Sequence, residues 1–167
     1  MTELPDRVTR AFSDDSTFEQ VEPGRYKSTT TAFEGSVEAT PAEEGRIRFD
    51  ITVRVPGLNA VTEGEVAPVV TDDWYRTFRL RVEDVGGIAR GDHDWQPHLS
   101  RDDDSGEIRI ETDLTEIAER RGVADARAFI DFVEGTYVQG IIPGYEYTAP
   151  VSDILSKARQ QGGSDGI

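Results

Sequence analysis

The segment from Arg46 to Val55 constrains the fold more than any other part of this chain. Apolar residues fill every second position, and charged or polar residues fill the positions between them; the apolar set is Ile47, Phe49, Ile51, Val53 and Val55. Because successive side chains of a strand point to opposite faces, this alternation predicts a strand with one face on a core and the other in water. Such a strand is typical of an antiparallel sheet, whereas the strands of a doubly wound parallel sheet are apolar on both faces.

Helical spacing of apolar residues indicates the helices. Residues 4–12 carry one apolar stripe, and residues 123 to about 139 carry the clearest stripe in the chain. The acidic sequence at 113–116 resembles a capping box and predicts a short helix that Gly122 ends. A last helix is predicted over residues 150–159.

Residues 71–85 fit two structures. As a helix, the segment places Trp74, Phe78, Val82 and Val85 on one face. As a strand, it alternates apolar and charged residues from Phe78 onward. Acidic residues at its start and two glycines after its end are typical helix boundaries, so we favour the helix.

The remaining segments predict short strands and turns. Together with the helices they give the order helix, strands, helix, two strands, helices. This order predicts an α+β fold with an antiparallel sheet and helices packed on one face. We expect one domain over residues 1–159 and a flexible tail over 160–167. The predicted strands are 17–21, 25–32, 33–39, 88–99 and 107–112, with a turn near 32–33 and a hairpin loop at 41–45.

The charge composition indicates where the protein works. The chain of 167 residues has 33 acidic and 18 basic side chains and a formal charge of −15, and all its basic residues except Lys27 and Lys157 are arginine. At molar salt the Debye length falls to ~3 Å, so surface carboxylates scarcely repel one another. We therefore predict a halophilic protein. No apolar run is long enough to span a membrane and no signal peptide is visible, so we predict a cytoplasmic protein without a membrane partner.

The motifs of common catalytic sites are missing from the sequence. It has no cysteine, no phosphate-binding glycine loop and no serine nucleophile elbow. We predict no catalytic residue, no metal and no cofactor, and we favour a protein that is not an enzyme. Arg46, Arg48 and Arg54 share the polar face of one strand, but acidic residues are interleaved with them. We expect these arginines to form ion pairs within the chain, and we predict no nucleic-acid partner.

The two histidines support an alternative function. His93 and His98 flank Trp95, with Asp92 and Asp94 beside them. Imidazole nitrogens and carboxylate oxygens are metal ligands, so a small-molecule or metal pocket, or an enzyme site, could form near His93, Trp95 and His98. Because positions 93 and 98 point to opposite faces of a regular strand, ordinary strand or loop histidines are the simpler interpretation.

The most apolar and least charged stretch runs from Phe129 to Tyr147. It is either core beneath the sheet or an aromatic contact surface, and both interpretations stay open. The candidate binding residues are Trp74, Phe78, Tyr137, Tyr145 and Tyr147. On this hypothesis the chain is a non-enzymatic binding or protein-interaction module, with a partner protein or a second copy of itself as its partner.

Three stretches carry a resemblance to a known family: residues 4–12, residues 73–78, and residues 132–147. Over most of residues 1–159 the chain resembles a family of small acidic haloarchaeal proteins of unknown function. That resemblance implies a haloarchaeal cytoplasm, and it brings no activity and no catalytic residues. The element order also looks like that of type III secretion chaperones, which are dimeric α+β binding modules. This second likeness is one of topology alone.

The surplus of carboxylates predicts that stability depends on salt. We expect the melting temperature to rise steeply from dilute buffer to molar potassium chloride, because screening removes the repulsion that pushes the compact state apart. Thermal unfolding followed by circular dichroism across that range measures the effect. A melting temperature that stays constant would contradict the halophilic interpretation.

Overall fold

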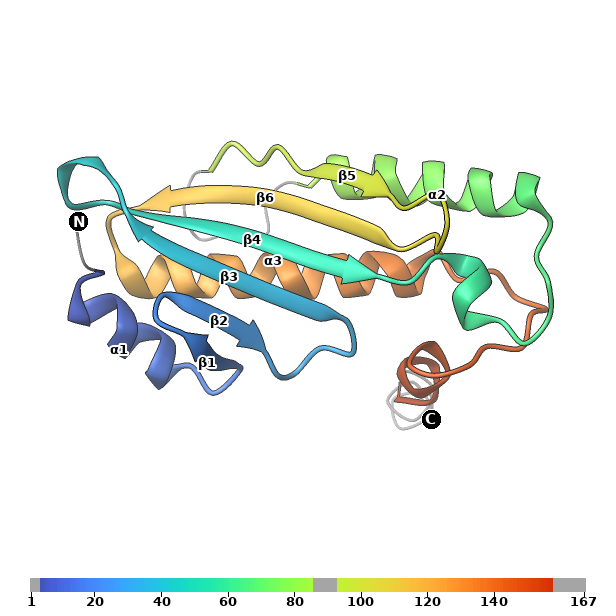
Figure 1. Ribbon diagram of the computed structural model, residues 1–167, viewed down its shortest axis with the longest axis horizontal. Helices are drawn as coiled ribbons and strands as arrows, with labels where there is room; N and C mark the ends of the chain where they lie inside the picture. Colours follow the sequence, from blue (N-terminus) through green and yellow to red (C-terminus); the bar gives the residue numbers. More distant parts are fainter. Residues whose placement is uncertain (1–3, 86–92, 158–167) are drawn as a thin grey trace, which may run out of the picture.

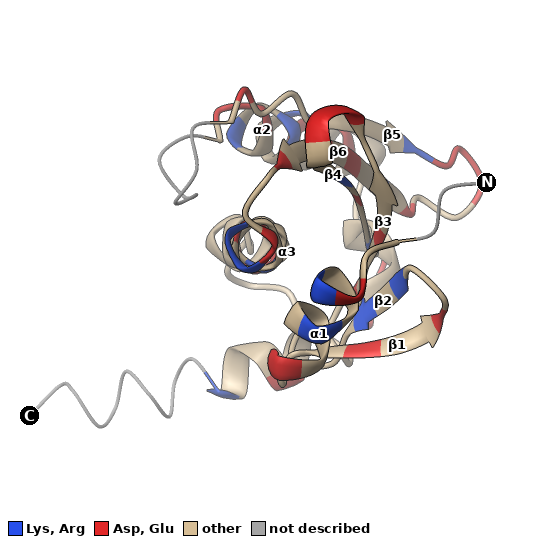
Figure 2. Ribbon diagram, turned by 90° about the vertical axis from the view of Figure 1, so that its left-hand side faces the viewer, with Lys and Arg blue, Asp and Glu red and all other residues tan. Residues whose placement is uncertain are grey.

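The computed structural model describes residues 4–85 and 93–157 and has the α+β architecture predicted from the sequence. One antiparallel sheet has the strand order β1-β2-β3-β4-β6-β5, and the three longer helices lie on one face of it (Figures 1 and 2). Residues 151–157 are also helical. The elements are α1 (Asp6–Asp14), β1 (Phe18–Glu22), β2 (Arg25–Ser28), β3 (Glu34–Pro41), η1 (Glu43–Gly45), β4 (Ile47–Val55), η2 (Leu58–Val61), α2 (Pro68–Glu83), β5 (His98–Arg101), β6 (Ile108–Glu116) and α3 (Glu119–Gln139).

Strand β4 is the centre of the sheet, as its alternating sequence predicts. It pairs with β3 on one side and with β6 on the other, and all nine of its residues are in register with β6. Its five apolar side chains are buried and face α3, while Arg48 and Arg54 are exposed on the other face. The two faces of this one strand therefore separate the core from the polar surface.

Helix α3 runs along β4 and β6, with α1 on one side of it and α2 on the other (Figure 2). Two glycines allow the helix to approach the sheet closely. A Cβ atom on Gly35 of β3 would lie 2.8 Å from the side chain of Ile130, and one on Gly122 of α3 would overlap the ring of Phe49. The short distance between α3 and the sheet therefore requires glycine, which has no side chain, at both positions.

The prediction of a short helix from 113 to 122 is wrong. Residues 113–116 continue β6, because Leu114 pairs with Phe49 and Glu116 pairs with Ile47 at the far end of the long strand β4. Gly122 does not end a helix either. It lies within α3, where close packing requires the absence of a side chain.

Two predicted strands are shorter in the structure. Strand β2 ends at Ser28, and the loop that follows brings Phe33 into the core, where its ring centroid lies 4.7 Å from that of Tyr137. Of the predicted strand 88–99, residues 93–97 have no regular structure and only His98–Arg101 pair with β6; residues 88–92 lie outside the described part.

The ambiguous segment at 71–85 is a helix, as we predicted. It begins earlier, at Pro68, which occupies the first helical turn where its missing N–H group costs nothing. Trp74, Phe78 and Val82 are its buried residues. The glycines at 86 and 87 and the predicted tail at 160–167 lie outside the described residues.

No helix among the described residues is both long enough and apolar enough to cross a membrane.

We predict that alanine substitutions at two glycines of α3 change the stability in opposite directions. Gly122→Ala forces a methyl group against the buried Phe49 ring, and overpacking of this kind costs about 1–3 kcal/mol, more than the gain in helix propensity. Gly135→Ala is the control, because nothing lies within 4 Å of its position. It should raise the free energy of unfolding by up to about 1 kcal/mol.

Chemical denaturation of both variants in high salt measures this pair of effects. Stabilisation by both substitutions would contradict the close approach of α3 to β4.

Candidate functional site

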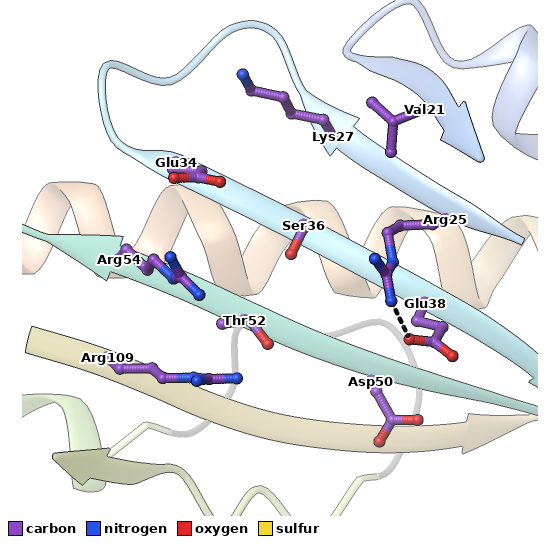
Figure 3. A pocket seen from close by; sticks show the side chains of 10 residues that line it. All are labelled: Val21, Arg25, Lys27, Glu34, Ser36, Glu38, Asp50, Thr52, Arg54 and Arg109. Atoms are coloured by element: carbon purple, nitrogen blue, oxygen red, sulfur yellow. Dashed lines mark hydrogen bonds and ion pairs between the residues drawn. The ribbon is translucent and has the colours of Figure 1, made fainter.

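The sheet face opposite α3 contains a hollow of about 380 Å³ (Figure 3). The short hydroxyl side chains of Ser36 and Thr52 lie at its centre, and longer charged side chains surround them. The hollow follows from strand alternation, because its lining residues lie between neighbours that point into the core. The lining residues are Val21, Arg25, Lys27, Glu34, Ser36, Glu38, Asp50, Thr52, Arg54 and Arg109.

Like charges face each other across β4 and β6 on either side of the hollow's centre. Asp50 is opposite Asp113, and Arg54 is opposite Arg109. Such pairs are destabilising unless a counter-charge lies between them. The acidic pair has one, because the guanidinium of Arg48 lies 3.0 Å from Asp50 and 3.4 Å from Asp113. The hydrogen bond to Asp50 and the charges of both carboxylates raise the pKa of Arg48.

The basic pair is compensated less well. Arg109 forms an ion pair of 2.6 Å with Glu111 on its own strand. The side chain of Arg54 makes no hydrogen bond or ion pair with any described residue, although Glu34 is its register partner on β3. The side chain of Lys27 also has no such contact within the described ranges. Positive charge is therefore available at one end of the hollow.

Arg25 differs from these cations. Its guanidinium lies 3.2 Å from Glu38 on the neighbouring strand and 3.6 Å from Glu22. The sequence predicts ion pairs within the chain for Arg46, Arg48 and Arg54, and the structure confirms this for Arg48 but gives neither of the other two a carboxylate partner among the described residues.

Three of the predicted aromatic binding residues lie in the core. Trp74 and Phe78 on α2 are stacked with centroids 5.7 Å apart, and both rings meet the edge of Tyr137 on α3. Tyr137 is fully buried, and its hydroxyl donates a hydrogen bond of 2.9 Å to the carbonyl of Pro56. Burial raises the pKa of this hydroxyl, so it stays protonated and remains a donor.

The other two aromatic candidates, Tyr145 and Tyr147, lie half-buried in the loop after α3. The Tyr147 hydroxyl donates to the carbonyl of Ile142 at 2.6 Å and accepts from its N–H at 3.1 Å, which closes the loop on itself. A bridge to Thr62 attaches this loop to the segment before α2. A binding role for the five aromatic residues stays a prediction, and only these two tyrosines have substantial exposed surface.

The structure separates the two histidines. His98 is exposed on β5, opposite Glu111. His93 points inward, with its Nε2 atom 2.8 Å from Asp125 and its ring against Trp95. Among the described residues, His93, Glu116 and Asp125 form the group that could hold a metal ion.

Sequence reasoning placed His93 beside His98, Asp92 and Asp94, and it missed Glu116 and Asp125. A signal for Asp125 was present. It lies four residues before Phe129, on the buried stripe of the clearest helix, where a carboxylate is rare without a partner. The sequence gives no comparable indication for Glu116, because the pattern at 113–116 predicts the start of a helix and not the end of a strand.

Comparison with known proteins places the chain in a family. A family of unknown function, DUF5813, matches residues 13–157. The chain belongs to this family. The resemblance to a family of unknown function is thus confirmed, and the family description assigns no activity to its members. No curated protein and no solved structure matches the chain.

The buried hydroxyl of Tyr137 gives a test of the core interpretation. Tyr137→Phe leaves the Pro56 carbonyl without its donor, and an unsatisfied buried polar group costs about 1–3 kcal/mol. Tyr145→Phe is the matched control, because the Tyr145 hydroxyl has no hydrogen bond within the described residues. Urea denaturation in high salt should show a lower free energy of unfolding for the first variant alone. Equal stabilities would contradict a structural role for the hydroxyl.

Proposed function

We propose that this chain is a non-enzymatic binding module of a salt-rich cytoplasm, whose hollow sheet face binds an extended acidic segment of a partner protein. The supporting observation is the adjacent pair of Arg54 and Arg109 in a chain with a formal charge of −15. A carboxylate between the two guanidiniums would relieve their repulsion and accept charge-assisted hydrogen bonds from both.

The spacing of the cations favours an extended ligand. Lys27 lies on β2 and Arg109 on β6, with β3 and β4 between them. Three strand spacings amount to about 14 Å, which is much wider than one carboxylate or phosphate group. In an extended polypeptide, residues four apart point to the same side and are separated by about 14 Å. Two glutamates at that spacing match Lys27 and Arg109, which lie on opposite sides of the hollow across the strands.

Two of the hollow's three lining acids orient such a ligand, whereas the third, Glu34, lies beside Arg54. Glu38 and Asp50 lie on the side away from the Arg54–Arg109 pair, and both already have an arginine partner. Repulsion from these carboxylates directs an acidic segment toward Arg54, Arg109 and Lys27.

High salt makes the contact compatible with the acidic surface. In dilute buffer, the total charge of −15 repels any acidic partner over long distances. At about 1 M salt, charges more than ~3 Å apart are largely screened, whereas ions in direct contact still interact. Local complementarity then determines binding.

The residues of the hollow support binding without catalysis. They include no histidine and no cysteine, and the hydroxyls of Ser36 and Thr52 have no neighbouring imidazole to activate them. Carboxylates and guanidiniums arranged around two hydroxyls form a recognition surface rather than a nucleophile with its base.

A labelled deca-glutamate peptide tests the proposal in molar potassium chloride by fluorescence anisotropy. We expect binding to the wild-type chain and a loss of affinity of at least about tenfold in the R54Q/R109Q double variant, because charge-assisted hydrogen bonds contribute about 1.5–3 kcal/mol each. Arg76→Gln is the control, since Arg76 is an exposed arginine of α2 that does not line the hollow. It should bind like the wild type.

Three results would contradict the proposal: no binding by the wild type, equal binding by the double variant, or citrate and phosphate competing as strongly as the peptide. The last result would identify a small-anion site. Sedimentation of the unliganded chain is a further measurement. Self-association of the wild type that is lost in the double variant would identify a second copy of the chain as the occupant.

A further inference from the structure

Three chemically reactive side chains from distant parts of the sequence converge on the helix side of the sheet. His93 precedes β5, Glu116 is the last residue of β6, and Asp125 lies early in α3. The Nε2 atom of His93 lies 2.8 Å from Asp125 Oδ2 and 3.9 Å from Glu116 Oε2. The exposed fractions of the His93, Glu116 and Asp125 side chains are 7%, 10% and 1%.

We propose that His93, Glu116 and Asp125 form a binding site for one divalent transition-metal ion, with zinc as its best match. One imidazole nitrogen and two carboxylate oxygens form a mixed donor set, which suits zinc better than the all-oxygen sites of magnesium or calcium. Ligand atoms about 2.0–2.2 Å from a common ion lie at most ~4.4 Å apart. The three candidate atoms lie within 4.8 Å of one another, so small side-chain rotations complete the site.

Glu116 is already oriented for this role. Its Oε1 atom accepts hydrogen bonds from the backbone N–H groups of Ile117, at 3.0 Å, and Ala118, at 3.1 Å. These bonds hold the carboxylate at the end of β6 and leave Oε2 on the side of His93. Hydrogen bonds of this kind fix the geometry of metal-binding carboxylates in known sites.

An aromatic wall encloses the imidazole. The edge of the His93 ring meets Trp95, with centroids 5.5 Å apart, and Trp95 stacks on Phe129 of α3 at 5.3 Å. Phe129 lies one helical turn after Asp125, so the same face of α3 supplies both a ligand and part of the apolar surroundings. Exclusion of water strengthens the attraction between an ion and its carboxylates.

Metal binding changes which ring nitrogen of His93 carries the proton. In the present geometry, a hydrogen on Nε2 can donate to Asp125 Oδ2, while Asp125 has at least one further interaction. A bound ion takes the Nε2 lone pair, so this nitrogen gives up its hydrogen and neutral imidazole carries the proton on Nδ1. A divalent ion also brings two positive charges to the point where two poorly exposed carboxylates converge.

This site is independent of the hollow. Asp125 belongs to α3, which covers one face of the sheet (Figure 2), whereas the hollow lies on the opposite face (Figure 3). Failure of either proposal leaves the other unaffected.

Zinc binding to the chelator-treated chain in molar potassium chloride tests the site. We expect one zinc per chain by isothermal titration, with a change in tryptophan fluorescence because Trp95 contacts His93. His93→Ala and Glu116→Gln should each weaken binding by more than about 100-fold, which is the upper range for the loss of an outer-shell partner alone. Glu116→Gln keeps the side-chain size and an acceptor for both backbone N–H groups, so it should remain folded.

His98→Ala is the matched control, because it removes the exposed histidine and leaves the cluster intact. It should bind zinc like the wild type. Molar salt weakens adventitious binding to the many exposed carboxylates. The proposal is overturned if the folded wild type binds no zinc, if His93→Ala or Glu116→Gln binds it equally well, or if His98→Ala alone abolishes binding.

Discussion

The packing of α3 against the inner faces of β4 and β6 is the contact on which the rest of the structure depends. It requires the unbroken apolar alternation of β4, and it requires glycine at positions 35 and 122, where a side chain would collide with Ile130 or Phe49. Once α3 lies on the sheet, α1 and α2 pack beside it and Tyr137 joins the helix layer to the core. The opposite face of the sheet then carries the polar half of every strand.

The two candidate sites arise from this same arrangement in different ways. The hollow is lined by outward residues of β1, β2, β3, β4 and β6, so its charges are placed by strand register alone. The cluster of His93, Glu116 and Asp125 is placed by tertiary contact between a strand end, a helix and an irregular segment. The hollow is open to solvent, and we propose an acidic segment as its ligand, whereas the cluster is enclosed, and we propose a single ion there.

Both candidate sites lie in a chain with a surplus of acidic side chains. Among the described arginines without a carboxylate partner, which are Arg10, Arg46, Arg54, Arg81 and Arg121, only Arg54 lines the hollow. Carboxylates are common on this surface, but a fully buried one such as Asp125 is not. In both cases the local environment of the residue, and not its type, distinguishes a candidate site from the solvated surface.

The sequence by itself determined the fold class, the central strand and the helix over 123–139, because periodicities of two and about 3.6 residues are local properties of the chain. At 71–85 the periodicity fitted a helix or a strand, and the boundary residues favoured the helix. It did not determine where β6 ends, because the length of β4 opposite it sets that boundary. Nor did it reveal that Gly122 is a packing contact, that Arg54 faces Arg109, or that Asp125 meets His93. Those relations join residues far apart in the sequence, and only strand register and the docking of α3 bring them together.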